Sequence, residues 1–265
     1  MIINDIFINV NEFVPNDNVK DVTIIITHGI AEYSKYYEYA AKFFQNKGFN
    51  VLTYDLRGHG KSFGKRGYVD SYKDFLSDLN ELILYAKKKT KKVFLVGHSL
   101  GGVITNTYAA KYGNVDGVII SAAPSDFYKS LRKIRFLPYN LLMKNKKIFT
   151  NFYDKRLTTV NNYEKDILDL DYYYLKLPAE VMIRGMRVLK KNFKNYRVPL
   201  LVIHSKKDPI VSYDNSQNTY NKAATKDKEI ILYENSYHNL FNDIEKDLIL
   251  NDILNWVNKR IWKII

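Results

Sequence analysis

Short apolar runs alternate with amphipathic stretches of helical period along most of this sequence, and this alternation limits the possible folds more than any other feature. It predicts parallel strands between layers of helices, because such strands need apolar cover on both faces. We expect strands at 22–28, 50–55, 92–98, 115–121, 199–205 and 229–234, and helices at 36–47, 72–89, 100–112, 213–224 and 244–261. Gly48 and Gly113 fall where helix C-terminal caps belong. Residues 2–10 and 12–14 suggest a small N-terminal hairpin.

One segment breaks the alternation. From residue 126 to residue 197 the sequence is basic and aromatic-rich, with no convincing buried strand. It holds 17 Lys and Arg against 7 Asp and Glu, a difference of +10 in a chain whose formal net charge is +13. Because it lies between two expected sheet strands, we predict that it is a helical cap over one end of the sheet. The core would then consist of residues 1–125 and 198–265.

The composition excludes several function classes. The 265 residues include no cysteine, which rules out disulfide bonds, thiolate metal sites and cysteine nucleophiles, and fits a reducing cytoplasm. The N-terminal sequence lacks the basic and long apolar regions of a signal peptide. No apolar run reaches the roughly 18 to 20 residues that span a bilayer. We therefore expect a soluble, cytoplasmic protein.

The net charge of +13 leaves nucleic acid and an anionic membrane surface open as partners. A genome rich in A and T would give the same abundance of Lys, Asn, Ile and Tyr without a functional cause. No nucleic-acid reader motif accompanies the charge, so no nucleic-acid partner is expected. The oligomeric state is left open.

The strongest local signal is the sequence GHSLGG at 97–102, which follows an apolar strand and opens a helical stretch. This context is typical of a nucleophile elbow, a tight strand-to-helix turn that lifts a serine hydroxyl out of the sheet. Gly97 and Gly101 lack the Cβ atoms that would clash in so sharp a turn. Ser99 is therefore the candidate nucleophile.

A nucleophilic serine needs a histidine base and an acid that orients it, and at a nucleophile elbow the expected chain order is serine, acid, histidine. His238 lies in the loop after the last expected strand and satisfies this order. The other histidines either precede Ser99 in other turns or end a strand, where packing is expected: His28, His59, His98 and His204.

The acid is expected at the end of the preceding strand. Asp208 lies there and is followed by Pro209, which would stiffen the turn. Asp214 and Asp243 are rivals, but Asp214 is expected in the first turn of one helix and Asp243 as the cap of the next. We therefore favour Asp208.

An oxyanion that forms during acyl transfer needs two backbone N–H donors. The first expected donor is the N–H of Leu100, directly after the candidate nucleophile at the start of a helix. The second is the N–H of Ile30 in the turn after the first core strand, where Gly29 permits unusual backbone angles.

The sequence DLRGHGKS at 55–62 ends like a phosphate-binding loop but lacks its first glycine, because Asp55 occupies that position. We therefore expect no phosphate site there. No cluster of residues has the spacing of metal ligands. Neither a metal nor another cofactor is expected.

Five motifs together closely resemble those of the monoacylglycerol lipase and lysophospholipase group of α/β-hydrolases. They occur in the order and spacing of that family from about residue 20 to the C-terminus: HGIAEYSKYY at 28–37, DLRGHGKS at 55–62, GHSLGG at 97–102, SKKDPIV at 205–211 and YHNLFND at 237–243. The resemblance implies the α/β-hydrolase fold, a mostly parallel central sheet flanked by helices and carrying a helical cap. Two positions depart from the family: Ser205 replaces a common glycine, and Asp243 replaces a frequent glutamate.

By this resemblance, Ser99, Asp208 and His238 match the catalytic triad. Ile30 and Leu100 match the two oxyanion donors. The resemblance therefore implies the same five residues as the reasoning from motif and chain order.

The resemblance also implies roles outside the triad. Residues 126–197 match the cap that forms the acyl tunnel, and this is the part that differs most from relatives, so acyl length and head group are left open. Arg57 and Glu32 match positions that we expect to be structural, as a buried pair that braces the oxyanion loop.

The implied activity is hydrolysis of the carboxylic esters of monoacylglycerols or lysophospholipids through an acyl-enzyme. Three alternatives are left open. The first is a general short-chain carboxylesterase that uses the same residues. The second is a peptidase or acyltransferase with the same triad. The third is a non-catalytic protein that binds lipid or an anionic surface.

The expected cap interleaves aromatic and basic residues, which suits an amphipathic lid that rests transiently on anionic lipid. A cap that packs its aromatic rings on the core and exposes its lysines would have the same composition. The residues concerned are Phe127, Tyr128, Phe136, Tyr139, Phe149 and Phe152, with Arg132, Lys133, Arg135, Lys144, Lys146 and Lys147.

Overall fold

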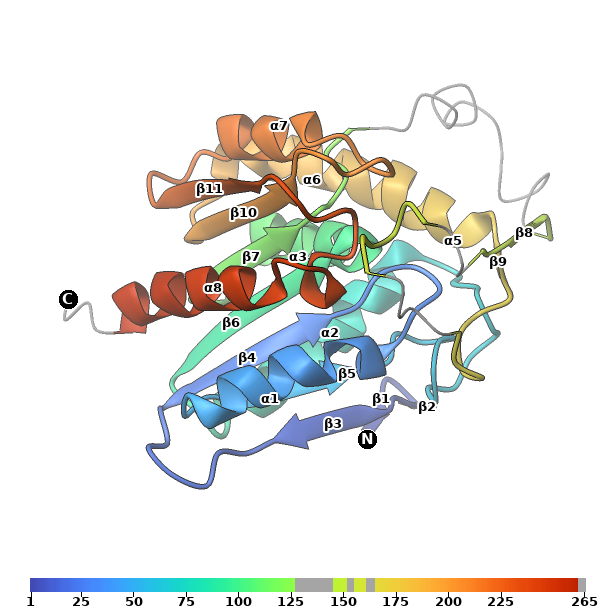
Figure 1. Ribbon diagram of the computed structural model, residues 1–265. Coiled ribbons are helices and arrows are strands. Elements are labelled where there is room, and N and C mark those ends of the chain that lie inside the picture. The colour runs from blue at the N-terminus through green and yellow to red at the C-terminus, as the bar shows by residue number, and fades with distance from the viewer. Residues whose placement is uncertain (127–144, 152–154, 161–164, 262–265) are drawn as a thin grey trace.

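A central sheet of seven strands organises the computed structural model, which describes residues 1–126, 145–151, 155–160 and 165–261 (Figure 1). The strands lie in the order β11-β10-β7-β6-β4-β5-β3. Their bounds are β3 Val10–Phe13, β4 Val22–Thr27, β5 Asn50–Tyr54, β6 Lys92–His98, β7 Gly117–Ser121, β10 Leu200–Ser205 and β11 Lys228–Tyr233. All neighbours pair in parallel except β3, which is antiparallel to β5. The predicted α/β architecture is confirmed.

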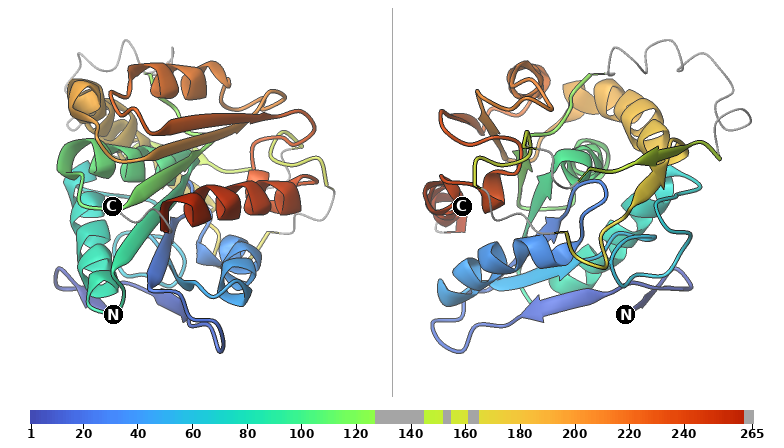
Figure 2. Two further views of the ribbon diagram at one scale, coloured as in Figure 1. Left: turned by 90° about the vertical axis from the view of Figure 1, so that its left-hand side faces the viewer. Right: turned by 45° about the vertical axis from the view of Figure 1, so that its right-hand side comes forward.

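Helices cover both faces of the sheet. Their bounds are α1 Glu38–Asn46, α2 Tyr72–Lys87, α3 Ser99–Tyr112, α6 Met186–Asn192, α7 Asp214–Lys222 and α8 Lys246–Ile261. Figure 2 shows α1 and α8 on one face and α2, α3 and α6 on the other. The helices lie close to the positions expected from the amphipathic period.

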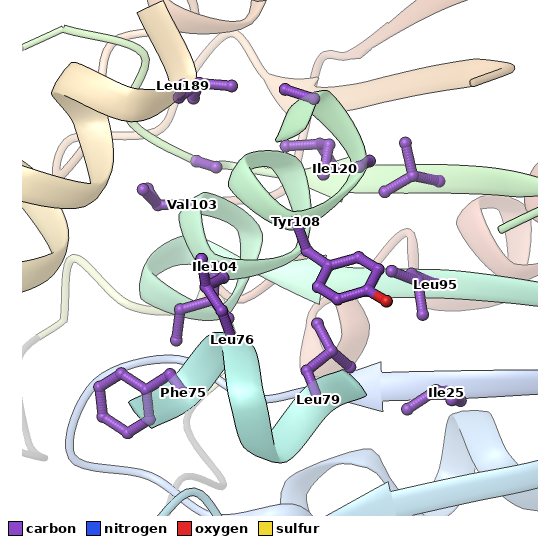
Figure 3. Close-up of a cluster of buried hydrophobic side chains, with 14 of the residues drawn as sticks. Ile25, Phe75, Leu76, Leu79, Leu95, Val103, Ile104, Tyr108, Ile120 and Leu189 are labelled. Carbon is purple, nitrogen blue, oxygen red and sulfur yellow. The ribbon is translucent and has the colours of Figure 1, made fainter. Parts of the chain in front are cut away.

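The alternation of side chains along each strand creates two cores. Ile24 and Ile26 of β4 belong to the cluster under α1 and α8, whereas Ile25 between them belongs to the cluster under α2 and α3. Figure 3 shows the second cluster, in which Leu79 and Tyr108 pack toward the strands. Apolar residues that follow one another are therefore all buried, and this explains the unbroken apolar runs.

The helix ends follow the sequence signals. Ser71 and Asp74 form a capping box at the start of α2, each accepting a hydrogen bond from a backbone N–H of the first turn or the cap. Gly113 ends α3 in the left-handed region at φ +61°, and Gly48 follows α1 at φ +88°. The expected glycine caps are confirmed.

The N-terminal segment differs from expectation. Strands β1 (Ile2–Ile3) and β2 (Ile6–Phe7) form a much shorter hairpin than expected, closed by Asn4 and Asp5 at positive φ. Strand β3 does not join them but adds an edge strand to the main sheet. The hairpin prediction was wrong in extent, because an amphipathic pattern indicates a strand without indicating its partner.

The inserted segment contributes to both the surface and the core. Strands β8 (Lys147–Phe149) and β9 (Tyr172–Tyr174) form an antiparallel pair, neither of them fully buried. Helix α5 (Lys176–Ala179) continues through a π-helical stretch, Glu180–Gly185, into α6, and this run packs against α3. The division into core and cap at residues 126 and 197 stays a prediction.

Parallel pairing brings the carboxyl ends of four strands to one edge of the sheet. Thr27 of β4 lies opposite Gly97 of β6, and Ser121 of β7 lies opposite both His98 and Ile203. In open α/β sheets this edge carries the ligand site. Among the described residues, no helix is both long and apolar enough to cross a membrane.

Candidate active site

Ser99 stands at the sharp turn between β6 and α3. Its φ is +51°, a left-handed conformation that is unusual for a residue other than glycine, and its side chain is almost fully buried. A Cβ on Gly97 would lie 2.1 Å from Thr105 Oγ1, and one on Gly101 would lie 2.3 Å from the carbonyl oxygen of His28. Neither position has room for a Cβ. The turn has the form of a nucleophile elbow.

His238 and Asp208 complete a chain of hydrogen bonds from Ser99. His238 Nε2 lies 3.1 Å from Ser99 Oγ, and its Nδ1 lies 2.7 Å from Asp208 Oδ2. Because the Asp208 carboxylate can only accept a hydrogen bond, Nδ1 carries the hydrogen, and Nε2 is free to accept the serine proton. The structure therefore brings together the three residues that the sequence singles out.

The Asp208 carboxylate is held in its charged form. Burial acts to raise the pKa of this carboxyl, but hydrogen bonds from His204 and His238 outweigh it and lower the pKa below its ordinary range. Two backbone N–H groups, from Ile210 at 2.8 Å and Val211 at 2.9 Å, also donate to Oδ1. Asp208 is therefore a full anion when it orients His238.

The two expected oxyanion donors flank the elbow. Leu100 lies in the first turn of α3, where backbone N–H groups have no acceptor within the helix. Ile30 lies in the turn after β4, next to Ala31, which is held at φ +68°. Gly101 lets these two segments meet, because a Cβ at this position would lie 2.4 Å from the carbonyl oxygen of Thr27 and 2.3 Å from that of His28.

Glu32 and Arg57 do not form the expected pair. Glu32 accepts hydrogen bonds from the Gly29 N–H at 2.5 Å and from the Tyr37 hydroxyl at 2.6 Å. Arg57 instead makes two hydrogen bonds, of 2.6 and 2.7 Å, to the Asp78 carboxylate of α2. The pairing was wrong, because the turn after β5 points Arg57 toward α2.

Glu32 nevertheless braces the oxyanion turn, through its bond to the Gly29 N–H. Burial raises the pKa of its carboxyl to about 7, although the hydrogen bonds from Tyr37 and Gly29 oppose that rise. This carboxyl therefore changes its charge near neutral pH.

The rival acids have other partners. Asp214 lies in the first turn of α7, as expected, and accepts a hydrogen bond from the Ser212 hydroxyl. Asp243 does not cap α8. It accepts from the N–H groups of Thr159 at 3.0 Å and Tyr237 at 2.6 Å, and so ties the inserted segment to the His238 loop. Its capping role was wrong, because α8 begins three residues later.

Three other histidines are structural neighbours of the site. His28 accepts a hydrogen bond from the Leu56 N–H, and burial lowers its pKa to about 4. His59 packs against the His28 ring, and burial lowers its pKa to about 3. His98 lies with its ring centroid 4.9 Å from that of His238, and burial lowers its pKa well below the ordinary value. All three are held neutral.

The fourth histidine, His204, is packed near the end of β10 as expected, but its contact with the candidate acid was not predicted. His204 Nε2 lies 3.0 Å from Asp208 Oδ2, the same oxygen that His238 contacts. The four-residue spacing between His204 and Asp208 could have indicated this contact only if the turn after β10 had been known. The role of this histidine is considered below.

The loop at 55–62 is built around its own carboxylate. Asp55 accepts hydrogen bonds from the Ser34 N–H at 3.0 Å and the Lys61 N–H at 2.8 Å. A Cβ on Gly60 would lie only 2.3 Å from Asp55 Oδ2. An anion already fills the space that a phosphate would need. Among the described residues no cluster of metal-ligating side chains occurs.

A seven-stranded, mostly parallel sheet with a serine at a strand-to-helix elbow defines the α/β-hydrolase class. Residues 19–245 match the family model described as serine aminopeptidase, S33. The chain belongs to this family.

Similar proteins include several lipases. The chain is 26% identical to a monoacylglycerol lipase of Mycolicibacterium smegmatis, over 88% of this chain and 87% of the relative. It is 24% identical to a phospholipase of Bacillus subtilis, over 84% of this chain and 90% of the relative. A solved monoacylglycerol lipase of Paleococcus ferrophilus has the same fold, with a TM-score of 0.84, 23% identity and coverage of 96% and 99%. The chain is a carboxylic ester hydrolase.

Proposed function

We propose that this chain hydrolyses the ester bond of monoacylglycerols or lysophospholipids through an acyl-enzyme on Ser99. The observation that carries the proposal is the hydrogen-bonded chain from Ser99 through His238 to Asp208 at the carboxyl edge of the sheet. The lipases and the phospholipase to which the chain is similar support the substrate class. No cofactor takes part.

In the first step, His238 Nε2 removes the Ser99 proton as Oγ attacks the ester carbonyl carbon. The charged Asp208 carboxylate stabilises the imidazolium that forms and fixes the ring by its bond to Nδ1. The N–H groups of Ile30 and Leu100 would hold the oxyanion, at about 3 to 4 kcal/mol per donor. The imidazolium then gives its proton to the departing alcohol.

In the second step, water replaces the alcohol. His238 takes a proton from this water, which attacks the acyl carbon on Ser99, and the released acid leaves the serine free. The same imidazole acts as base and then as acid in each half of the cycle, so no external proton carrier is needed.

Apolar contacts beside the oxyanion turn favour a fatty acyl group. Leu170 and Tyr173 of the inserted segment pack against Ile30 and Ala31. The backbone N–H of Leu170 also donates to the Ala31 carbonyl oxygen at 3.0 Å. The inserted segment therefore places apolar side chains next to the oxyanion turn, and ligand sites for apolar groups have linings of this kind.

A side-by-side assay tests the substrate class. We expect faster turnover of 1-monoacylglycerols or lysophospholipids than of short p-nitrophenyl esters and amino-acid amides, by about tenfold or more. Each buried methylene of a longer acyl chain adds about 0.8 kcal/mol of favourable burial. A preference for short esters would instead make the chain a general carboxylesterase, and a preference for amides would make it a peptidase.

We also propose that the inserted segment touches anionic lipid. Of the basic and aromatic residues expected to form this surface, Lys146, Lys147 and Phe149 lie within the described residues, and the remainder lie outside them. Figure 1 shows β8 and β9 on the side toward which β4 points. Phe149 is 76% exposed.

Lysines and tyrosines gather beside Phe149. Lys147 lies 3.8 Å from the Tyr172 ring, and Lys65 lies 4.2 Å from the Tyr174 ring. Exposed aromatic rings with adjoining lysines suit the interface of an anionic bilayer. The geometry supports a transient contact through this basic and aromatic surface.

Vesicle sedimentation tests the contact. We expect binding to vesicles that contain phosphatidylglycerol, weaker binding at high salt, and at least about thirtyfold weaker binding after Lys65→Glu with Lys147→Glu, since each lysine contributes about 1 kcal/mol. Lys91→Glu is the control, because Lys91 is exposed directly before β6, at the amino ends of the strands, and pairs with Asp21. Binding that does not weaken at high salt, or no binding to vesicles that contain phosphatidylglycerol, contradicts the proposal.

A further inference from the structure

Asp208 has a second imidazole partner that the triad does not require. His204 is fully buried, and its Nε2 lies 3.0 Å from Asp208 Oδ2, close to the hydrogen of His238 Nδ1. The same Nε2 lies 2.8 Å from the carbonyl oxygen of Val211. On the other side of the ring, Nδ1 lies 2.6 Å from the Ser216 hydroxyl.

These contacts fix the tautomer of His204. A carbonyl oxygen can only accept, so the nitrogen that faces Val211 must carry a hydrogen. That hydrogen is shared between the Val211 carbonyl and Asp208 Oδ2. Nδ1 can then accept from the Ser216 hydroxyl, which is able to donate. His204 therefore presents an N–H to the triad acid without needing a positive charge.

The hydrogen bond from His204 completes the set of donors around the Asp208 carboxylate. Oδ1 accepts from the N–H groups of Ile210 and Val211, and Oδ2 accepts from His238 and His204. With four donors in place, the carboxylate plane has a single orientation. One lone pair of Oδ2 accepts from His204, and the other is aimed at His238.

We propose that His204 is a positioning residue, which donates Nε2–H to Asp208 Oδ2 and thereby orients the acid and sets how strongly it attracts the His238 proton. The proposal rests on the proposed function of Ser99, His238 and Asp208. His204 touches neither the substrate nor the reacting atoms.

The proposal predicts in which direction the acidic limb of the pH profile moves when His204 is replaced. A donor at Oδ2 draws part of the negative charge away from His238, so removing that donor leaves more charge to stabilise the imidazolium. In the free variant enzyme, His238 would then be protonated, and the enzyme inactive, up to a higher pH than in wild type. Within the part of the chain that the structure describes, His98 and Glu32 are further titratable groups that interact with these rings. Both are present in wild type and variant, so the difference between two pH profiles isolates the contribution of His204.

The kinetic test compares three variants in the pH profile of kcat/KM. We expect His204→Leu to lower kcat/KM about tenfold and to move the acidic limb up by about half a pH unit, in line with one lost hydrogen bond to a charged group. His204→Gln places an amide N–H where Nε2 stood and should restore the wild-type limb. Ser216→Ala is the matched control, because it removes a partner from the same buried ring but leaves the bond to Asp208.

The three variants separate positioning from stability. If Ser216→Ala moves the acidic limb as far as His204→Leu does, or if His204→Leu leaves it unmoved, the proposal is overturned. Melting temperatures are measured in parallel. A variant that only weakens the fold lowers the melting temperature without moving the limb.

A second measurement does not depend on any variant. In protein labelled with 15N at histidine, we expect the spectrum to show His204 protonated at Nε2 and unprotonated at Nδ1 near neutral pH. A hydrogen on Nδ1 alone overturns the proposal. If the wild-type protein lacks turnover, the proposed function fails, while this spectrum still decides whether His204 donates to Asp208.

Discussion

Ser99→Ala is expected to lower kcat by about a millionfold, as in hydrolases where the nucleophile of a triad is removed. The hydroxyl is the atom that would form the acyl-enzyme, and neither His238 nor water at the same place can replace it. The measurement is steady-state hydrolysis of a monoacylglycerol, with the melting temperature recorded for the same preparation. The fold should survive, because the bond from Ser99 Oγ to His238 is lost without disturbing the core.

The matched control is Ser212→Ala. Ser212 is exposed and bonds to Asp214 in the first turn of α7, away from the elbow. It should keep wild-type turnover. Near-full activity in Ser99→Ala would show that another residue is the nucleophile.

Asp208→Asn is expected to lower kcat by about ten thousandfold while KM changes little. An amide at this position can turn an NH2 group toward His238, which favours the wrong tautomer of the ring and leaves Nε2 unable to take the serine proton. Asp214→Asn is the control, since Asp214 lies in a helix and is exposed. If the Asp214 variant loses more activity than the Asp208 variant, the assignment of the acid is wrong.

The same substitution has a pH signature in stability. The pKa of Asp208 is lowered in the folded protein, so its charged form stabilises the fold above the ordinary carboxyl pKa of about 4, and this contribution is lost as the pH falls. Urea unfolding of wild type and Asp208→Asn should therefore differ more at pH 7 than at pH 3. An equal difference at both values would mean that the carboxylate is not held by these hydrogen bonds.

Much of this architecture is encoded locally. The inner parallel strands β4, β6, β7 and β10 are almost wholly buried, which requires an apolar run in the sequence of each. Helix α2 begins at a capping box and α3 ends at a glycine, where their backbone groups lack partners within the helix. Gly97 is required by contacts with Gly101, Gly102 and Thr105, which follow it closely in the chain. These features can be predicted because their physical cause lies next to them in the chain.

Pairings between elements could not be predicted in the same way. The partner of Arg57 is Asp78, which lies in α2 beyond the loop that follows β5, and no periodicity in the sequence indicates this contact. His204 meets Asp208 because the chain reverses between them, and the partner of β3 depends on the sheet edge that the other strands leave free. Each of these contacts depends on how segments distant in sequence are placed against one another, or on the conformation of a turn.

The most direct test of the account is the site of covalent modification. Purified protein is treated with a fluorophosphonate ester, digested, and mapped by mass spectrometry, with Ser99→Ala treated in parallel. We predict one phosphonyl group per chain, on the peptide that carries Ser99, and none on the variant. Modification of a different residue, or an unmodified wild-type protein, would contradict a nucleophilic Ser99 and with it the mechanism.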